Sequence, residues 1–240
     1  MQKTRNRLTP FLEIILIVLI GVFVFVLINK LIVHGKLGVK KYKLDDPLIQ
    51  ELYSGITDDD IKYLSRENHN SSSLDVGYIF TKATSSMTIE DIELGDKDFK
   101  ISYDSLDSAI KTTFGPDYKY DLTSISGEYD SYFEIDDKRI VFKIRYDKDQ
   151  QEYAGTYSYK ENDNILVKKE LVQATKTRLL NLKIAYTFYK HDGNYKICSD
   201  YKCSNIVKEV DDINNYKSDK YITVSLNKAS DEAYYFDSNK

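Results

Sequence analysis

Residues 139–146 read Arg-Ile-Val-Phe-Lys-Ile-Arg-Tyr, a pattern in which large apolar side chains recur at every second position. Successive side chains of a β-strand point to opposite faces of the sheet, so these apolar side chains would share one face. They are Ile140, Phe142, Ile144 and Tyr146. The basic residues between them would face water, which is typical of an antiparallel sheet with one solvated face.

The same period of two continues on both sides of this segment. Asp136-Asp137-Lys138 predicts a hairpin turn to a preceding strand over residues 131–135. Further strands are expected over residues 151–160, 165–172, 180–188, 195–197, 221–226 and 233–236. In one of these strands the alternation predicts a buried face made of Leu180, Leu182, Ile184, Tyr186 and Phe188. Together these patterns predict an antiparallel β-sheet meander over about residues 117–240.

The chain before this β-rich part has the signals of short helices. Asp-Asp-Pro at residues 45–47 and Thr followed by three Asp at residues 57–60 are both typical of helix starts. Residues 102–114 begin with a capping Ser and are followed by Gly-Pro, which ends a helix. Helices over about residues 45–116, followed by the sheet, predict one α+β domain spanning residues 45–240.

Short helices packed on a curved sheet resemble the NTF2-like domains of membrane-anchored accessory proteins in cell-envelope machines. The resemblance is carried by the order of helices and strands alone. It implies an accessory assembly subunit of a membrane complex as one alternative, but a shared architecture does not transfer a function.

An unbroken apolar run occupies residues 14–28, and flanking apolar residues extend it to 11–33. About 20 such residues cross a hydrocarbon core roughly 30 Å thick as a helix. A cleaved signal peptide has an apolar core of about 7–15 residues followed by small residues at its cleavage site, and no such site follows here. The sequence therefore predicts an uncleaved transmembrane signal-anchor helix over residues 11–33.

The flanks of this helix suggest its orientation. Residues 1–10 are short and basic, as expected of the cytoplasmic end of a signal anchor, and long domains cross the membrane largely regardless of their charge. We expect a single-pass membrane protein with a basic juxtamembrane linker at 34–44 and an extracytoplasmic domain beyond it. The Lys-, Ile-, Asn- and Tyr-rich composition is typical of AT-rich bacterial genomes.

Charge is distributed unevenly along the chain. Residues 1–43 contain eight Lys or Arg and one Glu, whereas the rest of the chain contains 26 basic and 37 acidic residues. An acidic domain argues against nucleic acid as a partner. Four lysines after the apolar run are candidates for contacts with lipid headgroups, or are solvated lysines of a linker. They are Lys36, Lys40, Lys41 and Lys43.

Cys198 and Cys203 are the only cysteines of the chain. In a domain outside the cell they would close a small disulfide-bonded loop, whereas in the cytoplasm they would be free thiols. Too few ligands lie nearby in the sequence for a zinc site.

The sequence shows no recognisable catalytic motif. None of His34, His69 and His191 has the apolar surroundings expected of a catalytic imidazole, and no phosphate-binding loop or metal motif is present. We therefore expect neither enzymatic activity nor a cofactor or metal. Basic and aromatic residues of the predicted sheet suggest a binding face for peptide or glycan, with a solvated outer sheet face as the alternative. They are Arg139, Lys143, Arg145, Tyr157 and Tyr159.

Three functions remain compatible with these features. The leading hypothesis is an anchored surface domain that binds a protein or a cell-envelope component through a groove or sheet face with exposed tyrosines. The assembly subunit is the second. An envelope hydrolase is the third, and it would require a deep cleft with paired carboxylates.

The predicted orientation can be tested by protease treatment of intact cells that carry a tag after Lys240. We expect the tag to be lost without lysis, because residues 45–240 would lie outside the membrane. A tag that survives until the membrane is opened would place this domain in the cytoplasm and contradict the prediction.

Overall fold

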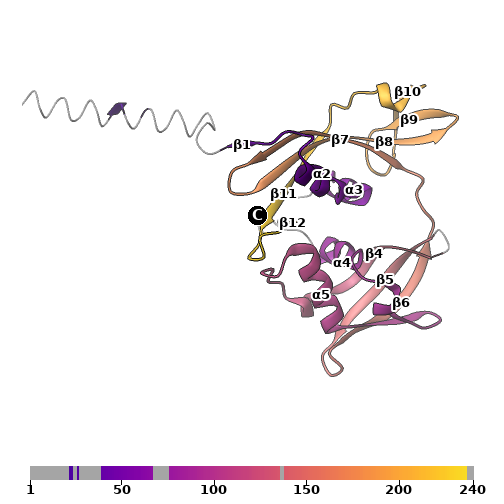
Figure 1. The fold of residues 1–240 in the computed structure, drawn as a ribbon. Coiled ribbons are helices and arrows are strands. Elements are labelled where there is room, and N and C mark those ends of the chain that lie inside the picture. The colour runs from indigo at the N-terminus through magenta and orange to yellow at the C-terminus, as the bar shows by residue number, and fades with distance from the viewer. Residues whose placement is uncertain (1–21, 24–25, 27–38, 67–75, 136–137, 237–240) are drawn as a thin grey trace, which may run out of the picture. The chain divides into compact units, whose positions relative to one another are not determined.

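The computed structural model describes residues 22–23, 26, 39–66, 76–135 and 138–236, and it divides the chain into a unit of residues 1–41 and a unit of residues 42–240 (Figure 1). Most of the predicted membrane helix, the N-terminal tail and Lys36 lie outside the described residues. Within the described part of the chain, no helix combines the length and the apolar character needed to span a bilayer.

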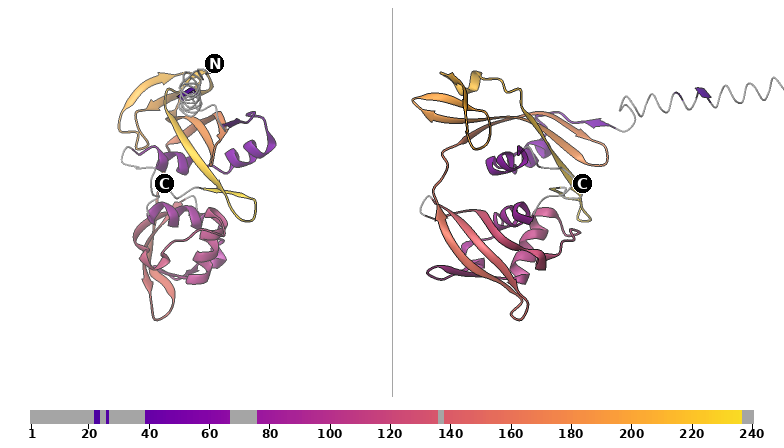
Figure 2. Two further views of the ribbon diagram at one scale, coloured as in Figure 1. Left: turned by 90° about the vertical axis from the view of Figure 1, so that its left-hand side faces the viewer. Right: turned by 180° about the vertical axis from the view of Figure 1, so that it is seen from behind.

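The first unit is described at a few positions. Val22, Phe23 and Val26 are helical and have exposed side chains. The short strand β1 (Lys40–Lys41) lies at the end of this unit. The second unit contains two layers of helix on sheet, which we call the first and second lobes, and it confirms the predicted α+β class (Figures 1 and 2).

The first lobe consists of helices α2 and α3 and an antiparallel sheet. The helices are α2 (Pro47–Ser54) and α3 (Asp58–Leu64). The strands are β7 (Leu166–Lys176), β8 (Leu180–Asp192), β9 (Asn194–Cys198), β10 (Ile206–Val210), β11 (Tyr221–Lys228) and β12 (Tyr234–Phe236), and a 3-10 turn, η3 (Ile213–Asn215), precedes β11. β8 is central: β7 pairs along one edge, and β11 and β9 pair with successive halves of the other.

The core of this lobe lies between β8 and the two helices. The five residues predicted to form the buried face of the strand at 180–188 are all buried, which confirms that prediction. Ile49 of α2 and Ile61 of α3 are fully buried against them. Leu48, which follows Pro47 in the first turn of α2, is 37% exposed.

The helix starts are those predicted from the sequence. The Asp46 side chain accepts a hydrogen bond from the N–H of Leu48, with Pro47 at the first helical position. Thr57 and Asp60 form a reciprocal capping box, in which each side chain accepts from the backbone N–H of the other residue.

The second lobe places helices α4 and α5 on a second antiparallel sheet. The helices are α4 (Val76–Thr84) and α5 (Tyr103–Phe114), with 3-10 turns η1 (Ile89–Asp91) and η2 (Leu122–Ser124). The sheet order is β2 (Glu93–Leu94), β3 (Asp98–Ser102), β6 (Glu152–Lys160), β5 (Lys138–Asp147) and β4 (Ser126–Ile135). Its core includes Phe80 of α4, Phe99 of β3 and Phe142 of β5, whose rings meet edge to face.

Two features of this topology differ from the prediction. β2 and β3 lie inside the segment expected to be helical, and the strands form two sheets rather than one meander. β3 has five residues, in which buried Phe99 and Ile101 alternate with exposed polar residues. It is fixed by long-range pairing with β6, in which Ile101 lies opposite Tyr153.

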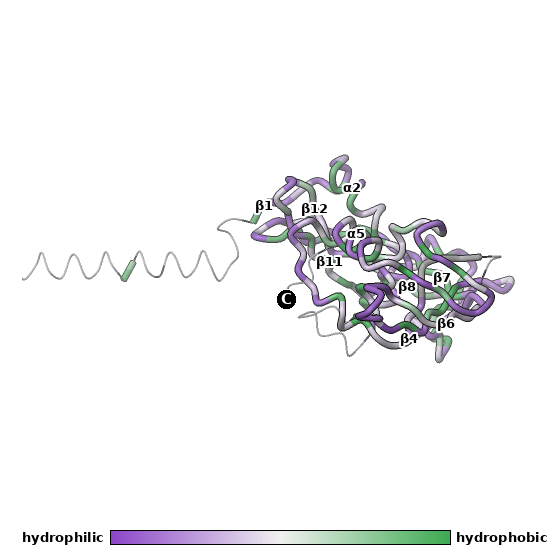
Figure 3. Tube along the Cα trace, turned by 90° about the horizontal axis from the view of Figure 1, so that it is seen from below, coloured by the Kyte–Doolittle hydropathy of each residue, from purple (hydrophilic) through white to green (hydrophobic). Residues whose placement is uncertain are grey.

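The chain visits the first lobe twice. It builds α2 and α3, then the whole second lobe, and returns at β7 to build the first sheet, as the colour gradient of Figure 2 shows. Phe236, in the last strand, packs against the cores of both lobes. Hydrophobic and hydrophilic residues are interleaved along the trace, as expected where each strand has a buried and an exposed face (Figure 3).

The two lobes are joined by a buried ion pair between α3 and α4. The Lys82 ammonium lies 2.6 Å from Asp60 Oδ2, and the hydroxyl of Tyr78 donates to Asp60 Oδ1 at 2.8 Å. Lys82 also lies over the ring of Phe236, 4.5 Å from its centroid. Both charged residues are almost completely buried, so the pairing compensates for charges that have been removed from water.

Removing one partner of this pair should destabilise the protein strongly. We expect Lys82→Met to lower the free energy of unfolding by about 3–5 kcal/mol, because it leaves the Asp60 carboxylate buried without its cation. Urea unfolding monitored by circular dichroism would measure the loss.

The matched control is Lys62→Met, which removes a cation of α3 from a pair whose carboxylate, Asp163, is 48% exposed. This variant should lose only about 0–1 kcal/mol. Equal losses in the two variants would contradict the assigned role of the buried pair.

Candidate binding site

A cleft of about 710 Å³ lies where the two lobes meet. The lining comes from α3 and Arg66 after it, from α4, from β4, β5 and the end of β6, and from the segment after β6 and the disulfide loop. The described residues that line it are Asp59, Lys62, Tyr63, Arg66, Val76, Gly77, Tyr78, Thr81, Glu128, Tyr129, Asp130, Arg139, Val141, Lys160, Asp163 and Tyr201. They come from segments far apart in the sequence, which the fold brings together.

Three ion pairs fix the walls of the cleft. Arg139 Nη1 lies 2.8 Å from Asp59 Oδ1, and Lys62 Nζ lies 2.9 Å from Asp163 Oδ1, so these pairs connect α3 to the start of β5 and to the segment between β6 and β7. The third pair joins Lys160 to Asp130 at 3.0 Å across the second sheet. These contacts make the cleft polar and hold its charged side chains in place.

The surroundings of the Asp163 carboxyl group change its pKa. Burial works to raise its pKa, but hydrogen bonds from the Lys62 ammonium and the Ile165 N–H outweigh burial, and the pKa is lowered from its usual value. Asp163 therefore stays ionised at neutral pH, as an acceptor rather than a proton donor.

Tyrosines and one arginine form the aromatic part of the cleft. The rings of Tyr63 and Tyr78 stack with centroids 4.1 Å apart. Arg66, which follows α3, places its guanidinium carbon 5.0 Å from the ring centroid of Tyr63 and 5.1 Å from that of Tyr201. Tyr129 reaches the cleft from β4 and donates its hydroxyl to the carbonyl of Ser126 at 2.8 Å. The aromatic residues thus come from both lobes.

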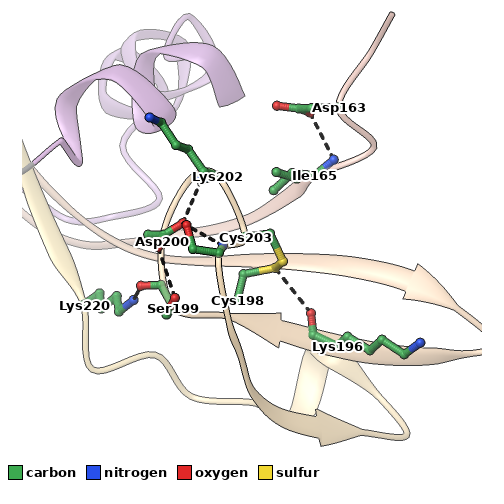
Figure 4. Close-up of a disulfide and its surroundings, with 10 residues drawn as sticks. Asp163, Ile165, Lys196, Cys198, Ser199, Asp200, Lys202, Cys203 and Lys220 are labelled. Atoms are coloured by element: carbon green, nitrogen blue, oxygen red, sulfur yellow. Dashed lines mark hydrogen bonds between the residues drawn. A yellow bond between two sulfur atoms is a disulfide. The ribbon is translucent and has the colours of Figure 1, made fainter.

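Tyr201 is held by the disulfide loop. Cys198 and Cys203 have their sulfur atoms 1.97 Å apart, which confirms the predicted disulfide. Inside the loop, the Asp200 carboxylate accepts hydrogen bonds from the N–H groups of Lys202 and Ser204, as Figure 4 shows for Lys202. Hydrogen bonds from Ser204 and Lys202 outweigh the opposing effect of desolvation and lower the pKa of Asp200. The loop therefore presents Tyr201 to the cleft on an anchored turn.

The residues predicted to form a binding face do not share one face of the sheet. Arg139, Lys143 and Arg145 lie on the outer side of β5, and Arg139 lines the cleft. Tyr157 pairs with the buried Phe142, and Tyr159 pairs with the buried Ile140, so these tyrosines lie on the opposite side. The prediction of one face from all five is wrong, because the register that fixes these pairings cannot be read from either strand alone.

The predicted lipid-contacting lysines are described only in part. Lys40 and Lys41 form β1, and Lys43 follows them; all three are exposed. Within the segment expected to be a linker up to residue 44, the N–H of Tyr42 donates to the carbonyl of Ala174 in β7 at 3.0 Å. Contact of these lysines with lipid stays a prediction.

The chemistry of the cleft favours binding. Three of its carboxylates are held by cations, and among the described residues no cluster of His, Cys, Asp and Glu has an arrangement that would hold a metal ion. Sequence reasoning included Arg139 but missed Lys62, Arg66 and Tyr201. Each belongs to an ordinary helix end or loop in the sequence, and the spacing carries no signal for their convergence.

Comparisons of the chain with protein-family models, with curated proteins and with solved structures gave no match in any of the three. The functional inference therefore depends on the site itself.

The disulfide should stabilise the domain. Replacing both cysteines by serine should lower the free energy of unfolding by on the order of 2 kcal/mol, since the bond restricts the unfolded chain over a short loop. Urea unfolding with and without dithiothreitol would measure this. The reductant should lower the stability of the natural protein and leave the double variant unchanged. Two titratable thiols in the folded, unreduced protein would contradict the bond.

Proposed function

We propose that this protein is a membrane-anchored, extracytoplasmic binding protein, and that the cleft between its lobes receives a segment of a protein partner or another cell-envelope component. The observation that carries the proposal is the cleft itself, with tyrosines and an arginine on walls contributed by both lobes.

The composition of the cleft supports recognition by contact. Tyr and Arg are enriched among the residues that contribute most to protein interfaces, because they combine a large contact area with hydrogen-bonding groups. In this cleft Tyr63 and Tyr78 are already stacked, and Arg139 is already paired with Asp59. A ligand would therefore meet side chains that lose little conformational freedom on binding.

The carboxylates of the cleft do not favour the hydrolase alternative. A glycosidase needs one carboxyl group with a raised pKa, so that it is protonated and can act as an acid. Asp163 shows the opposite, a lowered pKa, while Asp59 and Asp130 each lie beside a cation. These groups are better suited to holding lysine and arginine side chains in position.

The membrane anchor is supported by the apolar run at residues 11–33 and the basic residues on its two sides. The helical conformation and exposed side chains of Val22, Phe23 and Val26 are compatible with a lipid-facing helix. The disulfide fits an oxidising environment outside the cytoplasm.

A photo-crosslinking residue at position 141 would test the proposed site. Val141 lies on the outer side of β5 and lines the cleft, so a photoreactive side chain there should react with whatever occupies it. The full-length protein in its native membrane should give one discrete adduct, and Tyr129→Ala, which removes a cleft contact, should reduce its yield several-fold.

The matched control is the same photoreactive residue at position 148, an exposed site in the turn between β5 and β6. It should give no such adduct. A product of the same mass from both positions, or no product from position 141, would argue against the cleft as the binding site.

A further inference from the structure

Arg66 occupies a distinctive position in the cleft. It follows the end of α3, and its backbone N–H donates to the carbonyl of Tyr63 at 3.2 Å, which fixes the direction in which the chain leaves the helix. The residue is exposed, and its side chain lines the cleft. Its position is therefore set by a helix end while its charged group remains accessible.

Two tyrosine rings hold the Arg66 guanidinium. Tyr63 comes from α3, and Tyr201 comes from the disulfide loop, with ring centroids 5.0 and 5.1 Å from the guanidinium carbon. Contacts of this kind hold the planar group through its faces and leave its N–H edges able to donate hydrogen bonds. The arginine is thus positioned in advance, by residues that belong to different parts of the first lobe.

The other cations that line the cleft form ion pairs with carboxylates of the cleft. Lys62, Arg139 and Lys160 each have a carboxylate partner in the cleft wall. Among the residues that the structure describes, no carboxylate lies within ion-pair distance of Arg66. The fourth carboxylate of the lining is Glu128 of β4, which is the direct strand-pairing partner of Lys143 in β5.

We propose that Arg66 is the specificity-determining residue of the cleft and binds a carboxylate carried by a partner protein segment. This inference rests on the proposed function and names the chemistry of the ligand. A carboxylate is planar and matches the paired N–H edges of a guanidinium, so it can accept two hydrogen bonds at once. The neighbouring tyrosines would contact the chain that carries it.

The charge of the domain favours a protein segment over a polyanion. The chain beyond residue 43 has 37 acidic and 26 basic residues, and the cleft itself contains four carboxylates, so a polymer of phosphates would be repelled. A single carboxylate on an otherwise neutral segment avoids this repulsion and still satisfies Arg66.

Binding to an array of matched peptides tests this inference. Each pair of 12-residue peptides would differ by one replacement, Glu by Gln or Asp by Asn, and binding of the full-length protein in detergent would be measured for each. We expect the acidic member of the pairs that bind to be favoured about tenfold, because a charge-assisted bidentate contact is stronger than a hydrogen bond to a neutral amide.

Three variants separate recognition from folding. Arg66→Gln should abolish the preference for the acidic peptide, and Arg66→Lys should retain only part of it, because an ammonium lacks the planar pair of donors. Arg178→Gln, which changes an exposed arginine in the turn between β7 and β8, should keep the full preference. Unchanged unfolding midpoints would show that the losses are losses of binding.

The outcomes also separate this inference from the proposed function. Equal binding of acidic and amide peptides, lost on Tyr129→Ala, would overturn the role of Arg66 and leave the cleft as a binding site. Binding of phosphate-rich polymer in place of peptides would overturn the assignment of a protein carboxylate. No peptide binding together with a specific adduct from position 141 would do the same, whereas loss of that adduct would remove the proposed function as well.

Discussion

The ion pair between Asp60 and Lys82 joins the two lobes through charges that are buried away from water. A carboxylate and an ammonium are costly to bury, and the cost is offset only when both are paired and hydrogen-bonded. Here Asp60 also accepts hydrogen bonds from Thr57 and Tyr78. The Asp60 carboxylate therefore caps the start of α3 and also forms the ion pair with Lys82 of α4. A shift between the lobes would separate these two buried charges.

The residues next to Asp60 in α3 make further ion pairs. Asp59 pairs with Arg139 of β5, in the second lobe, and Asp58 lies 3.6 Å from Lys169 of β7, in the first lobe. The next turn of α3 then directs Lys62 toward Asp163. The three consecutive Asp residues, which the sequence explains as helix-start residues, serve three different contacts. The lining of the cleft comes from both lobes.

The disulfide loop adds an aromatic residue from late in the chain to the lining of the cleft. Cys198 is buried at the end of β9, and the closed loop places Tyr201 against Arg66, at the end of α3. A helix from the early part of the chain and a loop from its late part thus hold one guanidinium between them. Paired cations line the cleft, and beside them the Arg66 guanidinium lies against two aromatic rings.

Local patterns in the sequence determined the α+β class, the starts of α2 and α3, the buried face of β8 and the close pair of cysteines. These depend on side chains a few residues apart, whose spacing reflects helix caps, strand alternation or a short loop. Tertiary structure alone decided that there are two sheets, that β3 is a strand, and that Tyr157 lies on the opposite face from Arg139. It also decided that Lys62, Arg66 and Tyr201 meet in one cleft. Strand register and burial of a distant ion pair depend on contacts between residues far apart in the chain, and local spacing carries no information about those partners.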